Sequence, residues 1–129
     1  MAPTSDRLAL RLGAIFGFFA GILGAMSAHG AFHDYLDSQK LLDPWNTALN
    51  YQFFHALALL AVGQTLIARR ATVILWMLGT LCFCGSIYLR SVEPQVLWVH
   101  AVTPIGGVLL ILGWGWLFLT LLRKPKPTA

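Results

Sequence analysis

Four long apolar runs constrain the fold of this chain more than any other feature of its sequence. Each is about 17 to 21 residues long, the length that an α-helix needs to cross a hydrocarbon core of about 30 Å. The runs cover residues 12–28, 48–68, 72–89 and 104–122. They predict an all-α fold, in which four transmembrane helices form a bundle and residues 1–129 make a single integral membrane domain.

The composition agrees with a membrane protein. The chain is 57% hydrophobic and 11% charged, whereas about a quarter of the residues in soluble domains are charged. Its formal net charge of +4 comes from short basic clusters beside the apolar runs, as membrane topology requires, and not from a basic surface that would bind nucleic acid. We therefore expect the lipid bilayer as a partner and no nucleic acid.

The basic residues also predict an orientation, because short loops rich in Lys and Arg stay on the cytoplasmic side during insertion. Only Lys40 and Arg90 lie on the opposite side from the other seven basic residues, which are Arg7, Arg11, Arg69, Arg70, Arg123, Lys124 and Lys126. With an even number of spans, this distribution predicts that both the N-terminus and the C-terminus are cytoplasmic.

The first apolar run has an alternative interpretation as a secretory signal. Two arginines precede it, and Ala25-Met26-Ser27 supplies small residues of the kind found before a cleavage point. However, Gly13, Gly17 and Gly21 recur at every fourth position, a spacing that lets two membrane helices approach closely. A signal peptide has no packing reason for this spacing, so we expect a retained helix.

Two dipeptides predict where helices begin. Asp43-Pro44 and Thr103-Pro104 each place a capping oxygen before a proline, and proline is favoured at the first helical position, where its missing N–H is not needed. Between the first two runs, the mixed apolar and charged segment from Gly30 to Leu42 predicts a short surface helix.

Polar side chains inside or beside the apolar runs are the candidate functional residues, since each costs about 2 kcal/mol or more in lipid unless it finds a partner. They are His29, Tyr51, Gln52, His55, Ser86, Tyr88 and His100. If the helices pack in sequence order, these groups converge in one outer polar pocket. The pocket is either a hydrogen-bonded network that sets helix register, with His55 neutral and bonded to Ser86 or Gln52, or a ligand, metal or haem site.

The glycines give a second set of candidates, for close helix packing. They are Gly13, Gly17, Gly21, Gly85, Gly106 and Gly107.

The signal for a metal or cofactor is weak. His29 and His33 are four residues apart, but Gly30 interrupts the helix between them, and no HExxH or CxxC pattern occurs. Cys82 and Cys84 point about 200° apart on a helix and do not share a ligand. The ligands of any metal remain unknown at this point, and we expect no cofactor. Without a phosphate-binding glycine loop or an intramembrane carboxylate, we do not expect an enzyme.

Several segments together resemble a known family. They are Ala28-His29-Gly30, the run Tyr51-Gln52-Phe53-Phe54-His55-Ala56-Leu57-Ala58-Leu59-Leu60, Gly85-Ser86-Ile87-Tyr88, Thr103-Pro104-Ile105-Gly106-Gly107 and Gly113-Trp114. Over nearly the whole chain, the sequence is similar to the YgdD and YwdK family of small bacterial membrane proteins. The resemblance implies four transmembrane helices and the bacterial inner (plasma) membrane, and it implies no particular chemistry, since the family has no established activity.

Three classes of function follow from these patterns. The glycine stripes favour a structural or accessory membrane component with a membrane-protein partner or a homo-oligomer. The outer polar cluster favours small-molecule, metal or haem binding as the alternative. A small transporter or channel is disfavoured, because the spans carry no charged residue at their middle.

Overall fold

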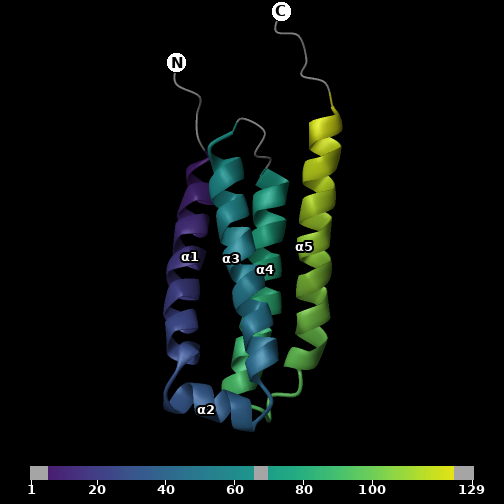
Figure 1. The fold of residues 1–129 in the computed structure, drawn as a ribbon. Helices are drawn as coiled ribbons and strands as arrows, with labels where there is room; N and C mark the ends of the chain where they lie inside the picture. Colours follow the sequence, from purple (N-terminus) through teal and green to yellow (C-terminus); the bar gives the residue numbers. More distant parts are fainter. Residues whose placement is uncertain (1–5, 66–69, 124–129) are drawn as a thin grey trace, which may run out of the picture.

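The computed structural model describes residues 6–65 and 70–123, and these residues form five helices. The helices are α1 (Arg7–Ala28), α2 (Ala31–Ser38), α3 (Leu42–Gly63), α4 (Arg70–Val92) and α5 (Val99–Leu122). The four long helices run side by side, and α2 lies across one end of them, beneath α1 and α3 (Figure 1). The predicted all-α character is therefore confirmed for the described residues.

The prediction of four transmembrane helices is wrong. Within the described residues, three helices are long and apolar enough to cross a membrane, namely α1, α4 and α5. The helix α3 has 22 residues, but its first half carries Asp43, Asn46, Asn50 and Gln52, which lower its mean hydropathy. The predicted placement of both termini in the cytoplasm relied on an even number of spans. Three candidate spans do not match that prediction.

The basic residues used to predict the orientation are only partly described. Arg69, Lys124 and Lys126 lie outside the described residues. The starts of α1 and α4 and the end of α5 share one end of the bundle (Figure 1), which brings Arg7, Arg70 and Arg123 to that end.

The predicted helix starts differ in accuracy. The helix α3 begins at Leu42, two residues before the predicted first position Pro44, and Leu41 occupies the cap position in place of Asp43. The end of the predicted 48–68 run falls partly on residues outside the described ones. By contrast, α5 begins at Val99, so that Pro104 lies inside the helix. The Thr103 hydroxyl does not cap the helix and instead donates to the Val99 carbonyl at 3.0 Å. The expected surface helix is confirmed as α2, which follows Gly30 at a φ of 83°.

Glycines, which have no side chain, let α1 approach α3 closely. A Cβ atom added at Gly13 would lie 2.8 Å from the Ala56 carbonyl oxygen and 2.8 Å from Cγ of Leu60. One added at Gly63 would lie 2.9 Å from Cδ2 of Leu10. A side chain at either glycine would therefore push the two helices apart.

The start of α1 is held from two directions. The Asp6 carboxylate accepts hydrogen bonds from the N–H groups of Leu8 at 3.0 Å and Ala9 at 3.2 Å, which caps the helix. Its own backbone N–H donates to the Gly63 carbonyl at 2.9 Å. This bond ties the beginning of α1 to the end of α3.

Glycines also determine the contact between α4 and α5. In each case an added Cβ would overlap an atom of the other helix: Gly79 would meet Leu110, Gly106 the backbone of Phe83, and Gly113 the indole ring of Trp76. Gly79, Gly113 and the α3 glycine Gly63 were not among the packing glycines predicted from the sequence. The other predicted glycines pack less closely. An added Cβ at Gly17 or Gly107 would make only ordinary van der Waals contacts. One added at Gly21 or Gly85 would meet no atom of the described chain within 4 Å.

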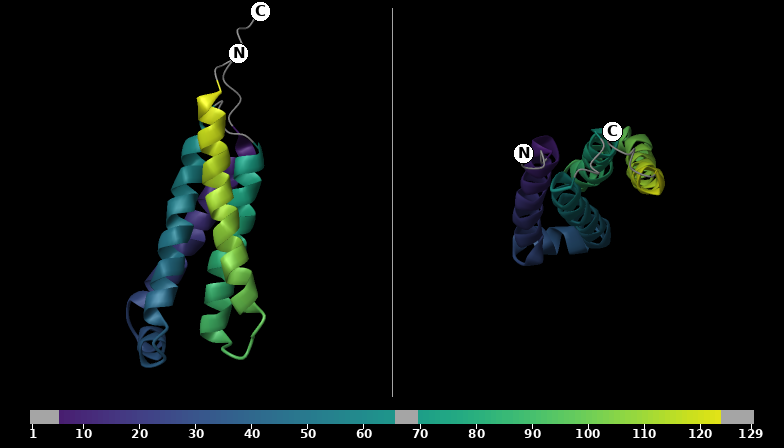
Figure 2. Two further views of the ribbon diagram at one scale, coloured as in Figure 1. Left: turned by 90° about the vertical axis from the view of Figure 1, so that its right-hand side faces the viewer. Right: turned by 90° about the horizontal axis from the view of Figure 1, so that it is seen from above.

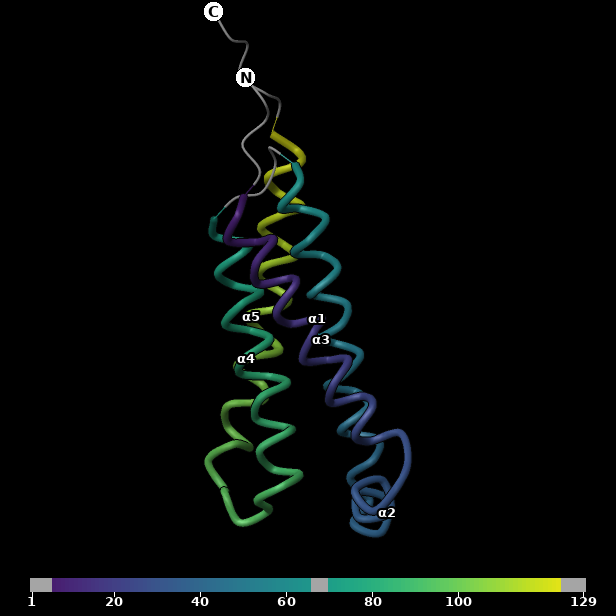
Figure 3. Tube along the Cα trace, turned by 90° about the vertical axis from the view of Figure 1, so that its left-hand side faces the viewer, coloured from purple at the N-terminus to yellow at the C-terminus, as the bar shows by residue number. Residues whose placement is uncertain are grey.

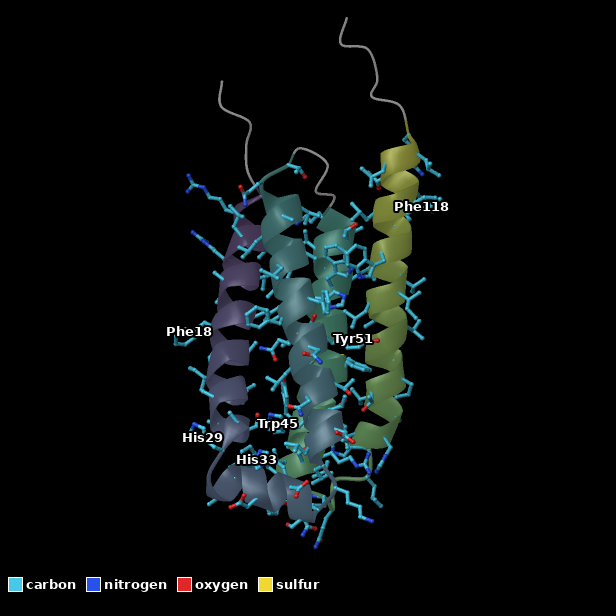
Figure 4. The ribbon with its side chains drawn as sticks, in the orientation of Figure 1. Phe18, His29, His33, Trp45, Tyr51 and Phe118 are labelled. Atoms are coloured by element: carbon cyan, nitrogen blue, oxygen red, sulfur yellow. The ribbon has the colours of Figure 1, made fainter. Side chains whose placement is uncertain are left out.

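The four long helices form an open arrangement and not a closed square. The helix α1 packs on α3, α3 on α4, and α4 on α5, so that α1 and α5 lie at opposite edges when the bundle is viewed along its axis (Figure 2). The tube in Figure 3 shows α1 crossing α3 at an angle as it descends to α2. Phe18 on α1 and Phe118 on α5 point away from the bundle on opposite sides (Figure 4).

The buried core still joins all four long helices. It contains Ala9, Phe16, Ala56, Leu59, Val73, Trp76 and Leu110.

We expect Gly13→Ala to lower the free energy of unfolding in detergent by about 1 to 3 kcal/mol, because the Cβ of the new alanine would overlap the backbone of α3. The matched control is Gly21→Ala, the same change on the same helix, where the Cβ meets no neighbour. Circular dichroism melting curves would compare the two. Equal, small changes in melting temperature would show that α1 does not depend on contact at Gly13.

Candidate functional site

The side chain of Gln52 connects three helices. From its position on α3, its Nε2 donates to the Phe16 carbonyl of α1 at 2.8 Å. Its Oε1 accepts a hydrogen bond from the Tyr88 hydroxyl of α4 at 2.9 Å. The two partners also determine the orientation of the amide, since a carbonyl requires the NH₂ end and the hydroxyl donates to the oxygen end. Gln52 is 5% exposed, and its partners satisfy both of its ends.

A row of aromatic side chains in contact with one another extends from Tyr88 to the α2 end of the bundle. The ring of Tyr88 lies 4.7 Å from the ring of Trp45 on α3. The Trp45 ring in turn meets Phe32 of α2 edge-to-face at 5.0 Å. The Tyr35 hydroxyl of α2 donates to the Ser91 carbonyl at the end of α4 at 3.1 Å. These contacts fix α2 against α3 and α4.

His55 forms a second group on α3, directed toward α5. Its Nδ1 lies 2.7 Å from the Tyr51 carbonyl, and its Nε2 accepts a hydrogen bond from the Trp114 indole at 3.1 Å. Because Nε2 accepts, the arrangement assigns a neutral imidazole with its proton on Nδ1. The Trp76 ring of α4 meets His55 edge-to-face at 5.8 Å and packs on Trp114 at 4.6 Å. Both ring nitrogens of His55 are therefore occupied within the bundle.

Two further bonds link neighbouring helices. The hydroxyls of Ser86 and Thr103 lie 2.7 Å apart and join α4 to α5. The buried Cys84 thiol of α4 donates to the Ala48 carbonyl of α3 at 3.2 Å. Since the Ser86 hydroxyl is paired with Thr103, it is not paired with His55 as a nucleophile would be.

The remaining histidines lie at the α2 end of the bundle. His33 places Nδ1 2.8 Å from the Ser27 carbonyl, where it connects α2 to the end of α1. His29 directly follows α1 and His100 lies in the first turn of α5, and both are exposed. In the part of the chain that the structure describes, no group of three or more His, Cys, Asp or Glu side chains is arranged to hold a metal ion.

The structure separates the candidate residues that sequence reasoning placed in one outer pocket. Gln52 bonds to Tyr88 of α4, Tyr51 packs on Phe83 of the same helix, and His55 bonds to Trp114 of α5. Ser86 forms its own pair with Thr103, and His29 and His100 join neither group. The separation follows from the open arrangement, in which α3 presents different sides to α1, α4 and α5.

Sequence reasoning did not identify Trp114 and Trp76 as partners of His55. The sequence offered no signal for this pairing, because the predicted runs end at residues 68 and 122, which lie 13 residues after His55 and 8 residues after Trp114.

The family model described as "Protein of unknown function (DUF423)" matches residues 23–107. The chain belongs to this family. The matched segment contains Gln52, His55, Tyr88 and the Ser86–Thr103 pair, while Phe16 and Trp114 lie outside it.

Individual DUF423 relatives are similar over most of their length. A UPF0382 membrane protein of Haemophilus influenzae is 39% identical over 111 residues, covering 81% of this chain and 86% of the relative. The UPF0382 membrane protein YwdK of Bacillus subtilis is 37% identical, covering 80% and 86%. The UPF0382 inner membrane protein YgdD of Escherichia coli is 33% identical, covering 95% of both chains. No solved structure matches the chain. This DUF423 chain is therefore a membrane protein of a family whose function is unknown.

We expect Trp114→Phe to destabilise the protein and Trp116→Phe to have little effect. The two tryptophans are exposed to a similar degree, 48% at Trp114 and 42% at Trp116, but only Trp114 donates to His55. Hydrogen bonds between membrane helices contribute about 0.6 to 2 kcal/mol. Melting curves of Trp114→Phe, His55→Leu and the double variant would measure the coupling between the two residues. Strict additivity of the two single changes would show that the bond contributes nothing.

Proposed function

We propose that this chain is a non-enzymatic structural or accessory component of the bacterial inner (plasma) membrane, and that it works by packing against another membrane protein or a second copy of itself. The main support is the use of its polar groups. Gln52, His55, Cys84 and Ser86 all form hydrogen bonds within the bundle. Groups that are already bonded hold helices together and are not available to transform a substrate.

The surface of α5 supports a role in assembly. One of its sides packs on α4 through glycines, while much of the rest carries large exposed apolar side chains. The exposed residues include Ile105, Val108, Ile111, Leu112, Phe118 and Leu119. In a membrane, such a surface contacts either lipid or another helix, and shape complementarity decides which one is preferred. Since α5 is an edge helix (Figure 2), a partner can reach it without disturbing the bundle.

The proposal includes no resident metal, haem or other cofactor. Both ring nitrogens of His55 have partners, and the two exposed histidines lie at different helix ends. For the location, support comes from three apolar helices in the described chain and from the Escherichia coli relative, which is named an inner membrane protein.

The test is photo-cross-linking in living cells, with a photoreactive amino acid placed at Ile111 on α5. We expect discrete cross-linked species that contain this chain and one protein partner or a second copy, because Ile111 is 71% exposed on the edge helix.

The matched control is the same photoreactive group at Phe54, which is 69% exposed but lies on α3 between the two edges. Adducts from Ile111 and none from Phe54 support assembly through α5. Cross-links to lipid alone from both positions contradict it. Metal analysis and an optical spectrum of the protein purified in mild detergent test the absence of a cofactor, and a stoichiometric metal or a haem absorption band would contradict that part of the proposal.

A further inference from the structure

A pocket lies at the end of the bundle where α4 ends and where α3 and α5 begin. It has a volume of about 400 Å³. Its polar lining comes from three helices: Thr47 of α3, Arg90 and Ser91 of α4, and His100 and Thr103 of α5. Gln52 and His55 do not line the pocket, whereas Thr103, which is paired with Ser86, forms part of its wall.

The charge of the lining favours an anion. Arg90 supplies a permanent positive charge, and no carboxylate is among the residues that the structure places around the pocket. A guanidinium group presents several N–H donors in a planar fork that matches the oxygen atoms of a phosphate. His100 adds an imidazole from the first turn of α5.

The hydroxyl groups that line the pocket already donate hydrogen bonds within the protein. Arg90 and His100 are therefore the side chains that remain to donate to a ligand. The hydroxyl of Thr47 donates to the Asp43 carbonyl at 2.9 Å. In the same way, Ser91 donates to Ile87 at 2.9 Å and Thr103 donates to Val99 at 3.0 Å. Each of these hydrogens is used within its own helix, so Arg90 and His100 are the lining side chains whose donors have no such bond.

The rest of the wall is apolar. Leu41 and Pro44 line it from the start of α3, and Ile87 and Pro104 line it from α4 and α5. A bare inorganic ion leaves these surfaces uncovered, whereas a ligand with an apolar part beside its anionic group covers them. A membrane phospholipid has this combination.

We propose that this pocket is a phosphate-binding site, in which Arg90 and His100 hold the anionic group and the apolar wall covers the adjacent part of the ligand. The phosphate belongs either to a phospholipid headgroup or to a free phosphate compound, and the two sources are distinguished by experiment. The site is independent of the assembly surface on α5.

Two binding measurements on the full chain test the proposal. Native mass spectrometry in detergent measures the binding of phosphatidylglycerol against a glucosyl diacylglycerol with the same acyl chains, which lacks phosphate. Isothermal titration with inorganic phosphate, on protein in phosphate-free detergent, measures the free anion. We expect phosphatidylglycerol to bind more tightly than the glycolipid, and Arg90→Gln to raise its Kd about tenfold or more, as the loss of a charge-assisted hydrogen bond predicts.

The matched control is Lys40→Gln, which removes a positive charge from the same end of the bundle but not from the pocket. Its Kd should stay within about twofold of the unchanged protein, because Lys40 is not one of the residues that line the pocket. His100→Gln should weaken binding less than Arg90→Gln, and Arg90→Lys should retain part of the affinity.

The outcomes separate the sources of the phosphate. Arg90-dependent binding of phosphatidylglycerol alone assigns the site to a lipid headgroup, and Arg90-dependent binding of inorganic phosphate as well assigns it to phosphate in general. Equal binding of the glycolipid, or equal weakening by Lys40→Gln and Arg90→Gln, overturns the proposal. Melting curves identify a misfolded Arg90→Gln, in which case Arg90→Lys and His100→Gln decide.

Discussion

The Gln52 amide joins three helices because its two ends form opposite kinds of hydrogen bond. The NH₂ end needs an acceptor and finds the Phe16 carbonyl of α1, while the oxygen end needs a donor and finds the Tyr88 hydroxyl of α4. Lipid supplies no hydrophobic drive that would press helices together, so their positions depend on such bonds and on close backbone packing. The bare backbone at Gly13 is what allows α1 to approach α3 closely.

The lack of a hydrophobic drive between helices in lipid also explains how α5 is attached to the bundle. Three glycine contacts hold it against α4, and two polar links add to them, one from Trp114 to His55 and one from Thr103 to Ser86. An edge helix held in this way keeps most of its apolar surface free, which connects the internal packing to the assembly role that we propose. The pocket around Arg90 arises differently, since α3, α4 and α5 leave space where their ends meet.

The residue types of the candidate site were predictable from the sequence, but their partners were not. Gln52 and His55 stand out as polar residues among apolar neighbours, which requires them to find hydrogen bonds. Their three-residue spacing suggested a shared pocket, whereas they bond to different helices. The glycine spacing likewise predicted the kind of contact but not which glycines would make it. The four-residue repeat of Gly13, Gly17 and Gly21 predicts a stripe, but α1 crosses α3 at an angle (Figure 3), and only the first glycine meets its backbone closely.

The sequence by itself determined that the chain is helical, that it belongs in a membrane and where most of its helices lie, because helix length and apolar character are local properties of successive residues. The tertiary structure decided that α5 continues back past Pro104 to Val99. It also decided which glycines approach a neighbour and which indole serves His55. These outcomes depend on crossing angles and on the depth of one helix relative to another, and such relations between distant segments are not contained in any single stretch of sequence.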